Sequence, residues 1–295
     1  MSSLTVVIPT YNRCDTLGRA ISAHARQTAS RDIAEILVVD DGSTDGTQAV
    51  VAEMSKGSPV HIRYLRQDNK GPAAARNTGI RAANTDLLLF TDDDIIPSPT
   101  LAAEHLGWHK NFPENSGAVL GRVVWSPQVN PTPFMNWYGT NGPLFAFARL
   151  DGRTEVEYRY FYSCNVSVKT EFLRNSGTFD EDFKIAAYED IELGYRLNKA
   201  GMRLRYNRHA LAYHEQHVSF ADACRRYRES RSAAEVLKRK EAGLHYPGPL
   251  NFEQRVFAPV LKWAGPVLSL FRGLMDARIP LPWTVYRAMF GAFRQ

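Results

Sequence analysis

The first hundred residues alternate between short apolar runs and segments with the spacing of amphipathic helices. Strands are predicted over residues 4–9, 34–40, 60–66 and 86–92. Helices are predicted between them, over 15–27, 44–54 and 72–84. Most of the strands are continuously apolar, which suits a sheet covered on both faces. The pattern therefore predicts an α/β fold with a mostly parallel central sheet and flanking helices.

Beyond residue 100 the pattern is less regular. It predicts a helix over 98–112, a strand over 117–124, and a long surface loop over 126–143, where Pro and Asn are frequent. Further on it predicts a helix over 188–201, strands over 203–206 and 210–214, and a basic helix over 219–241. We therefore expect one α/β domain over 1–220 and a helical extension over 221–295.

Composition narrows the class of protein. The chain has 295 residues, 44% of them hydrophobic, and is expected to be globular. Its three cysteines, Cys14, Cys164 and Cys224, form neither a disulfide framework nor a metal-type pair. The chain opens directly into a strand, and no apolar run approaches the roughly 20 residues of a spanning helix. We expect a cytoplasmic protein.

The positive charge is concentrated near the C-terminus. Residues 252–295 hold six basic and two acidic side chains, out of a net charge of +5. The aromatic residues interleaved with them include Phe257, Trp263, Phe271, Trp283, Phe290 and Phe293. This tail suits peripheral contact with an anionic membrane, and the alternative is a C-terminal cap or oligomer contact. Nucleic-acid binding is not expected, because the charge accompanies apolar residues and no recognisable reading motif.

Polar clusters follow three of the predicted strands, at 10–13, 40–45 and 92–94. In parallel sheets ligands bind beyond the carboxyl ends of the strands. The third cluster is three consecutive aspartates, which repel one another, so either the turn is solvated or a positive charge lies there. Mg²⁺ or Mn²⁺ takes oxygen ligands and bridges carboxylates to phosphates. The alternative is a solvated turn or a helix N-terminus.

Two further clusters have both structural and functional interpretations. In "VVDDGSTD" the residues 43–45 suit a helix cap, whereas one of the adjacent carboxylates Asp40 and Asp41 could accept a hydrogen bond from a nucleobase. In "NKGPAAARNTG" the position of Arg76, one turn into a helix after a glycine turn, could steady a diphosphate or a base. A solvated helix face is the alternative for Arg76.

In chain order these segments resemble glycosyltransferase family 2, the inverting nucleotide-sugar transferases of GT-A fold. "VVIPTYNR" is similar to the family's opening strand, "VVDDGSTD" to its nucleoside-binding turn, "GPAAARNTG" to its arginine helix and "LLLFTDDD" to its metal motif. "SCNVSVKTEFLRNSGTFDEDF" resembles its donor-side loop, and "YEDIELGYRL" the helix of the catalytic base. The resemblance covers about 4–220, although Cys164 and Thr178 stand where the family often has glycine.

The resemblance implies a nucleotide-binding half at about 1–97 and an acceptor or catalytic half at about 98–220. It implies nucleotide-sugar contacts by Pro9, Tyr11, Asp41, Arg76, Asp92, Asp93, Asn165 and Glu189. Asp41 would accept from uracil N3, which favours a UDP-sugar. Mg²⁺ or Mn²⁺ would be held by Asp94 and Asp92 with His214, preferred over His217.

Asp190 is implied as the catalytic base, and the alternative for the acids at 189 and 190 is a helix N-terminus that favours negative charge. The predicted function is transfer of a sugar to a glycan or polyprenol-linked acceptor in bacterial surface polysaccharide or glycoconjugate synthesis. A non-catalytic nucleotide-sugar-binding or scaffold protein is the alternative, and the intact D-x-D and E-D motifs argue against it. A dehydrogenase is disfavoured because no G-x-G-x-x-G turn follows the first strand.

Overall fold

The computed structural model describes residues 3–240, 272–278 and 280–293. Contacts divide the chain into two compact units. Unit 1 consists of Met1–Val124 and Leu150–Glu215, and unit 2 of Trp125–Arg149 and Gln216–Gln295. Each unit thus combines segments from two parts of the chain. The boundary that the sequence suggests at residue 220 stays a prediction.

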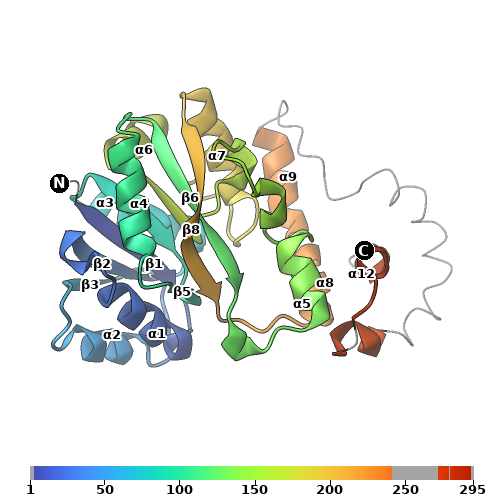
Figure 1. The fold of residues 1–295 in the computed structure, drawn as a ribbon. Coiled ribbons are helices and arrows are strands. Elements are labelled where there is room, and N and C mark those ends of the chain that lie inside the picture. The colour runs from blue at the N-terminus through green and yellow to red at the C-terminus, as the bar shows by residue number, and fades with distance from the viewer. Residues whose placement is uncertain (1–2, 241–271, 279, 294–295) are drawn as a thin grey trace. The chain divides into compact units, whose positions relative to one another are not determined.

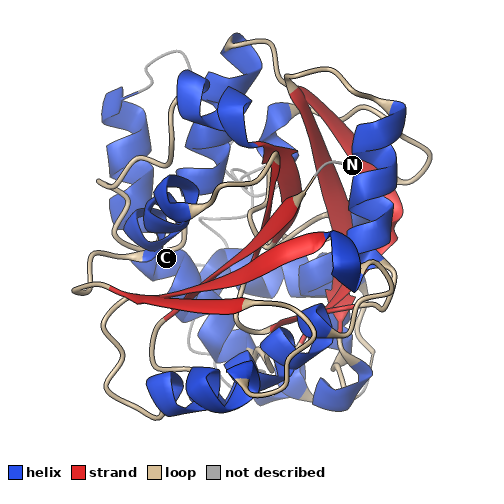
Figure 2. Ribbon diagram, turned by 90° about the vertical axis from the view of Figure 1, so that its left-hand side faces the viewer, coloured by secondary structure: helices blue, strands red, loops and turns tan. Residues whose placement is uncertain are grey.

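Unit 1 is built on an eight-stranded sheet with the order β3-β2-β1-β4-β7-β6-β8-β5 (Figure 1). The strands are β1 (Leu4–Thr10), β2 (Ile33–Asp40), β3 (Ile62–Arg66), β4 (Leu87–Thr91), β5 (Ile95–Pro97), β6 (Gly117–Trp125), β7 (Asn165–Lys169) and β8 (Arg203–His214). Strands β1 to β4 are mutually parallel, whereas β7 runs antiparallel to β4 and β6. The predicted α/β class with a mostly parallel sheet is confirmed, and Figure 2 shows the twist of this sheet.

Helices occupy the connections between the strands. In unit 1 they are α1 (Cys14–Ala25), α2 (Thr47–Ser55), α3 (Pro72–Ala82), α4 (Leu101–Asn111), α6 (Thr170–Ser176) and α7 (Glu189–Lys199). In unit 2 they are α5 (Pro133–Thr140), α8 (Phe220–Glu229), α9 (Arg231–Lys240) and α12 (Trp283–Phe293). Short 3-10 turns lie at Ser30–Asp32, Pro127–Val129, Phe147–Leu150, Tyr158–Tyr160 and Arg272–Asp276.

The register of the parallel strands explains why polar clusters converge. Thr10, the last residue of β1, pairs with Asp40, which in turn pairs with Arg66 at the end of β3. The carboxyl ends of these strands therefore lie side by side at one edge of the sheet. Strand β1 is buried along its whole length, as its continuous apolar sequence predicts.

The packing of α3 on the sheet depends on Gly79. A Cβ at this position would lie 2.4 Å from Cγ1 of Val7 on β1, so only glycine permits this approach of the helix to the strand. At the start of the helix Gly71 has a φ of +95°, which favours glycine, and its N–H donates to Asp41. The helix that carries Arg76 is thereby fixed against the carboxyl edge of the sheet.

The segment 126–143, predicted as a surface loop, contains the helix α5. Thr132 caps it by accepting from the Met135 N–H, and Pro133 occupies its first turn. Phe134 and Met135 are fully buried. The prediction was wrong here because Pro and Asn, read as loop residues, stand at the start of a helix and on its polar side.

Two further boundaries differ from the prediction, and three short elements were not predicted. The strands expected at 203–206 and 210–214 form the single strand β8, and the helix expected over 219–241 is broken at Ser230 into α8 and α9. Residue 241 lies outside the described residues. The short strands β5 and β7 and the helix α6 were not predicted.

Unit 2 has an aromatic core of its own. Its buried side chains come from α5, α8 and the C-terminal segment, and include Phe134, Trp137, Phe220, Tyr286 and Phe290. The ring of Phe134 contacts those of Phe220 and Tyr286, with centroids 5.3 and 5.9 Å apart. None of the helices in the described ranges has the length and apolar character needed to cross a bilayer.

Candidate active site

The acidic residues that follow β4 meet the segment that follows β1, because the two strands are parallel neighbours. Thr10 donates its hydroxyl to Asp93 Oδ2 at 2.8 Å. Arg13 reaches back to Asp94, with Nη1 2.5 Å from Oδ2, and lies 3.6 Å from Asp93 Oδ1. His214, the last residue of β8, places Nε2 3.3 Å from the same Asp94 oxygen. The charge repulsion in the triplet is thus balanced partly by the guanidinium of Arg13.

The pKa values of the two buried carboxyls of the triplet, Asp93 and Asp94, are shifted in opposite directions. Burial, together with the charge of Asp94, raises the pKa of Asp93 to about 7. Burial alone would also raise the pKa of Asp94, but His214 and Arg13 lower it to about 2. Asp94 therefore carries the charge at neutral pH and is better suited than Asp93 to attract a cation.

Arg76 lies between the triplet and the helix α7. Its side chain is 4% exposed; Nη2 is 2.9 Å from Asp92 Oδ1 and Nη1 is 3.1 Å from Glu189 Oε1. The guanidinium carbon lies 5.5 Å from the ring centroid of Phe179. Burial opposes the charge of Arg76, but the neighbouring carboxylates Asp92, Asp190 and Glu189 raise its pKa above the ordinary value.

The first turn of α7 presents two adjacent acids. Tyr188, immediately before the helix, has a φ of +68°, an unfavourable conformation for a bulky residue. Asp190 Oδ2 accepts a hydrogen bond of 2.8 Å from the Ser163 N–H, and Asp190 Oδ1 is buried without a partner among the described residues. Burial raises the pKa of both acids, and for Glu189 the charge of Asp190 adds to the effect, whereas Arg76 lowers both.

The turn after β2 is held by its own carboxylates. Asp41 Oδ1 accepts from Gln67 Nε2 at 2.7 Å and from the Lys70 N–H at 2.9 Å, and Oδ2 accepts from the Gly71 N–H at 2.8 Å. Asp40 Oδ1 accepts from the Ser43 N–H at 2.7 Å. These bonds tie β2 to the start of α3. They leave Asp41 buried at the sheet edge.

The remaining predicted contacts differ in exposure. Tyr11 is 48% exposed beside the site, and Pro9 is buried within β1. The side chain of Asn165 is 1% exposed and bound to the Ala210 carbonyl and to His105. The described contacts of Asn165 are structural, and its contact with a donor sugar stays a prediction.

The predicted metal ligands are only partly brought together. Asp94 and His214 share a contact, but Asp92 is paired with Arg76. No three His, Cys, Asp or Glu side chains within the described ranges are arranged to hold a metal. Mg²⁺ commonly takes one or two protein ligands, with waters and substrate phosphates completing its shell. The charged Asp94 beside His214 fits such a cation.

Sequence reasoning did not assign a role to Arg13, Thr10 or Phe179. Arg13 could have been suspected from its position. It lies three residues beyond the end of β1, and β1 is the parallel neighbour of β4, which leads into the acidic triplet. Phe179 could not be found from sequence, because its contact with Arg76 joins segments about a hundred residues apart.

A family model described as Glycosyl transferase family 2 matches residues 5–175. This is more than half of the 295 residues. The chain belongs to glycosyl transferase family 2. The predicted family is confirmed, and the family's enzyme class is the predicted one, a glycosyltransferase.

Curated relatives share part of their length with this family 2 chain. The validoxylamine A glucosyltransferase of Streptomyces hygroscopicus subsp. jinggangensis (strain 5008) is 34% identical over 237 residues, which cover 72% of this chain and 56% of the relative. The chondroitin synthase of Escherichia coli is 28% identical over 243 residues, 73% of this chain and 35% of the relative. The chain thus spans about half the length, or less, of these two relatives.

Two solved structures share the fold. The mannosyltransferase PcManGT from Pyrobaculum calidifontis, solved with GDP-Man and Mn²⁺, superposes with a TM-score of 0.66 and 19% identity, covering 99% of this chain and 85% of the other. TarS of S. aureus, solved with UDP, gives a TM-score of 0.58 and 18% identity, covering 99% and 89%. The GT-A-like fold of the family 2 chain is therefore as predicted.

The position of Arg76 among carboxylates yields a pH-dependent prediction. Arg76→Met should lower the free energy of unfolding by about 3 kcal/mol at pH 8, because Glu189 and Asp190 lose their buried cation. Without Arg76 the pKa of both acids rises further, so the folded state binds protons that the unfolded state has released. The loss should therefore shrink as the pH falls toward 5.

Urea unfolding of both proteins across this pH range measures the effect. Arg81→Met is the matched control on the same helix, since its side chain is 63% exposed and 3.8 Å from Glu181. It should change stability by less than about 0.5 kcal/mol. A loss for Arg76→Met that is independent of pH would contradict the proposed role of Arg76.

Proposed function

We propose that this family 2 chain is a metal-dependent inverting glycosyltransferase that moves a sugar from a nucleotide-sugar to a hydroxyl of a glycan or lipid-linked acceptor. The observation that carries the proposal is Arg76, whose guanidinium joins the acidic triplet after β4 to the acids of α7. A donor-side acidic motif and a candidate base thus belong to one connected site at the carboxyl edge of the sheet.

The donor is bound, in this proposal, by the turns after β1 and β2. Tyr11 offers an exposed aromatic face to a base, and Asp41 offers a carboxylate at the edge of the sheet. Of the solved structures of similar fold, one holds GDP-Man and another UDP. We favour UDP, with Asp41 as the acceptor for uracil N3. Pro9, Arg76, Asp92, Asp93, Asn165 and Glu189 are the other proposed donor contacts.

The proposed cofactor is Mg²⁺ or Mn²⁺, held by Asp94 and His214 with Asp92 nearby. PcManGT was solved with Mn²⁺. A bound divalent cation stabilises the charge that grows on a leaving diphosphate. The protein's own contribution is to keep Asp94 ionised, through the adjacent His214 and Arg13.

Asp190 is the proposed base. Its Oδ2 is oriented by the Ser163 N–H, which leaves the buried Oδ1 to accept a proton. The oxygen of the acceptor hydroxyl forms a bond to the anomeric carbon, the bond from that carbon to the diphosphate oxygen breaks, and the hydroxyl proton passes to Asp190. Because the pKa of Asp190 is raised, it is a stronger base near neutral pH than an ordinary aspartate.

Asp190 Oδ1, which has no hydrogen-bond partner among the described residues, also argues against a purely binding role. A structural acid at a helix N-terminus would be expected to place both oxygens on N–H donors or in water. A buried carboxylate oxygen that lacks a partner among the described residues, here next to Glu189, lowers the stability of the folded state. Such a cost is typical of a catalytic group.

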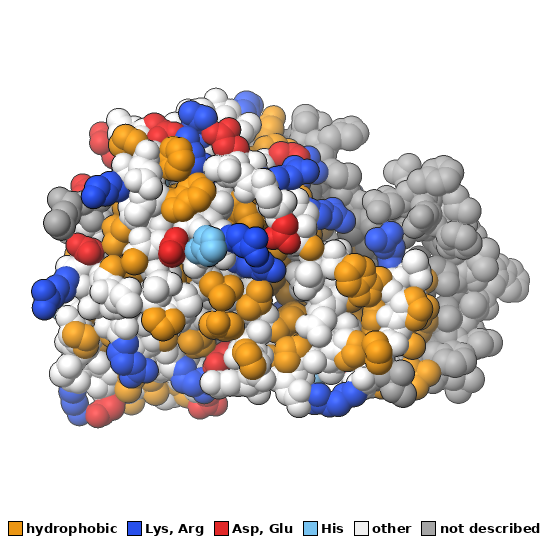
Figure 3. Space-filling view, viewed as in Figure 1, with side chains coloured by type: hydrophobic (Ala, Val, Ile, Leu, Met, Phe, Trp, Pro, Cys, Tyr) orange, Lys and Arg blue, Asp and Glu red, His pale blue; other side chains and the backbone are white. Residues whose placement is uncertain are grey.

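Unit 2 supplies the features for the proposed membrane contact. Trp283 is 56% exposed, Leu274 44% and Val285 37%, and Figure 3 shows hydrophobic side chains gathered over α5 and the C-terminal segment. Helices α8 and α9 add basic side chains at 225, 226, 228, 231 and 238–240. Apolar and basic groups in one unit suit an anionic surface.

The structure also revises part of the tail prediction. Phe290 and Phe293 pack in or against the core of unit 2, so neither is free to contact lipid. Phe257, Trp263 and Phe271 lie outside the described residues. The membrane contact therefore remains a proposal. The same holds for a polyprenol-linked acceptor, a location on the cytoplasmic face, an oligomer contact and a role in surface polysaccharide synthesis.

The metal ligands are tested by calorimetry with UDP and Mn²⁺. Asp94→Asn should weaken Mn²⁺-dependent UDP binding by at least about 100-fold, because it removes the charged ligand. Asp93→Asn, the neighbouring control, should weaken it by less than about 10-fold. Equal UDP affinity of the unaltered protein with and without Mn²⁺ would refute a metal site.

The base is tested by Asp190→Asn, which keeps the shape but cannot take the proton. We expect kcat to fall by a factor on the order of 10²–10⁴ with UDP affinity changed only a few-fold. For the unaltered enzyme kcat should decrease as the pH falls through the raised pKa of Asp190. Glu192→Gln is the control on the same helix, since Glu192 pairs with Arg196 at 2.6 Å and should affect stability more than kcat. Normal turnover by Asp190→Asn would exclude this residue.

The membrane contact is tested by co-sedimentation with anionic phosphatidylglycerol vesicles. The full chain should bind and be released by salt, because each basic residue near the surface contributes about 1 kcal/mol of screened attraction. Trp283→Ser should weaken vesicle binding and preserve UDP binding. Tyr11→Ser, a similarly exposed aromatic, should do the reverse. Vesicle binding that neither salt nor Trp283→Ser reduces, or no binding at all, would overturn the contact.

A further inference from the structure

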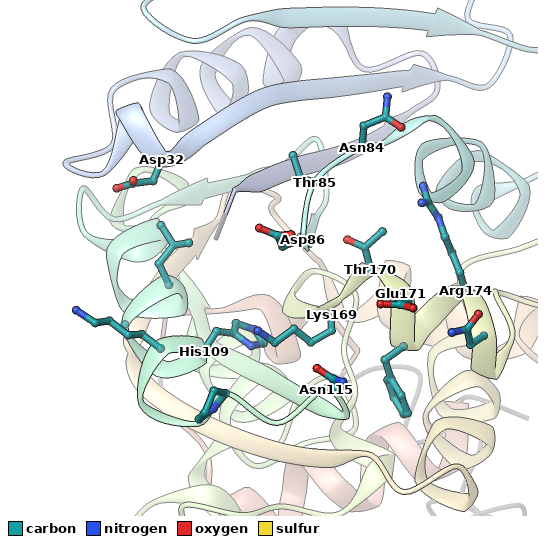
Figure 4. Close-up of a pocket in the computed structure, with 16 residues that line it drawn as sticks. Asp32, Asn84, Thr85, Asp86, His109, Asn115, Lys169, Thr170, Glu171 and Arg174 are labelled. Carbon is teal, nitrogen blue, oxygen red and sulfur yellow. The ribbon is translucent and has the colours of Figure 1, made fainter. Parts of the chain in front are cut away.

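A second pocket lies at the edge of the sheet opposite the candidate active site. Its volume is about 1250 Å³, and it is lined by residues that precede β2 and β4, by the end of α4 and by the start of α6. Asp32 and Asp86 stand where parallel strands begin, whereas the candidate active site lies where they end. Figure 4 draws the imidazole of His109 pointing from α4 toward the middle of the pocket, near Lys169 in the view. No proposed catalytic or donor contact lines it.

A chain of buried hydrogen bonds fixes the chemistry of His109. Asn165 donates its Nδ2 hydrogens to the carbonyls of Ala210 and Arg122, so its Oδ1 must accept from His105 Nε2–H at 2.9 Å. Burial lowers the pKa of His105 to about 4, so its ring is neutral and Nδ1 accepts the Ser167 hydroxyl hydrogen at 2.8 Å.

The Ser167 hydroxyl links His105 to His109. Its only hydrogen is donated to His105, so in the 2.9 Å hydrogen bond with His109 the Ser167 oxygen accepts from Nε2–H of His109. Burial is the largest cause, with smaller contributions from His105 and Lys169, and it lowers the pKa of His109 to about 3, so this ring is neutral too. His109 Nδ1 is therefore a lone-pair acceptor, 2% exposed as a residue and without a partner among the described residues.

Two neighbours complement this acceptor. The Thr170 hydroxyl is also buried without a partner in the described part of the chain, and it lines the same pocket. Lys169 lines it as well, and its ammonium lies near enough to influence the pKa of His109. An acceptor, a hydroxyl and a cationic donor on the lining of one pocket match a ligand hydroxyl, which both donates and accepts.

The rest of the lining does not favour a strongly charged ligand, because its acidic and basic side chains balance in number. Asp32, Asp86 and Glu171 oppose Lys110 and Lys169, while Arg174 is engaged by the carbonyls of Ile80 and Ala83. Three carboxylates would repel a phosphate, yet carboxylates and the side chains of Asn84, Asn115 and Asn175 readily accept from hydroxyls. The pocket thus offers more acceptors than cations, and its volume of about 1250 Å³ has room for one or two sugar rings together with water.

We propose that this pocket is an accessory binding site for an uncharged, polyhydroxylated ligand, a mono- or disaccharide unit, that is separate from the site of sugar transfer. The ligand places one hydroxyl between His109, Thr170 and Lys169, and its other hydroxyls meet the carboxylates and amides of the rim. Such a site would hold a glycan at a distance from the catalytic edge.

The test is an NMR titration of the full chain with glucose, galactose, mannose, N-acetylglucosamine and cellobiose, and with inorganic phosphate. At least one sugar should shift amide signals of residues 107–110 and 169–171 in a saturable way. Thr170→Val should weaken that affinity roughly 3- to 10-fold, because it removes a hydroxyl that has no hydrogen-bond partner among the described residues. Its melting temperature should be unchanged or higher, which a structural hydroxyl would not allow.

Gly107→Trp provides a steric block, since a side chain there meets nothing within 4 Å and Gly107 lines the pocket. It should abolish the sugar shifts, whereas Ala103→Trp, an exposed position on the same helix outside the lining, should keep them. UDP binding should be normal in both variants. The proposal is overturned if no sugar shifts these signals, if the shifts survive Gly107→Trp, or if phosphate produces them instead.

Discussion

The candidate site depends on one buried cation, the guanidinium of Arg76. Asp92, Glu189 and Asp190 come from two elements far apart in sequence, and their charges repel one another in a region with little water. Arg76 lowers the pKa of both acids of α7 while bonding directly to Glu189 and Asp92. Its own position depends on Gly79, which lets α3 approach β1 closely enough to bring the guanidinium to the edge of the sheet.

Much of the fold could be predicted because the strongest elements are locally determined. Most of the parallel strands are continuous apolar runs, and the helices between them have clear boundaries. The failures have a common physical cause, which is that tertiary packing decided the outcome. The segment around α5 became a helix because Phe134 and Met135 enter the aromatic core of unit 2, and β8 runs unbroken over Arg203–His214 between its sheet neighbours β6 and β5.

The candidate site was predictable as a set of positions and less so as a set of contacts. The acids at 92–94 and 189–190 follow from their places at a strand end and a helix start, and the structure joins them. Sequence alone does not say which way a side chain points. Asn165 is turned into a buried hydrogen-bond chain, and Arg13 supplies a positive charge to Asp94 that no local pattern indicated.

The same buried chain connects the interior of the sheet to its amino edge. Each hydrogen bond from Asn165 through His105 and Ser167 leaves the next group with one defined role, and the series ends on the lone pair of His109. A series of neutral groups suits this edge, since burial has lowered the pKa of both histidines far below neutrality. At the carboxyl edge, by contrast, the buried groups in contact carry full charges of both signs. Charged groups stabilise a leaving diphosphate, whereas neutral donors and acceptors recognise hydroxyls. The buried groups at the two edges of one sheet therefore differ in chemistry, which is the basis for proposing a different ligand at each.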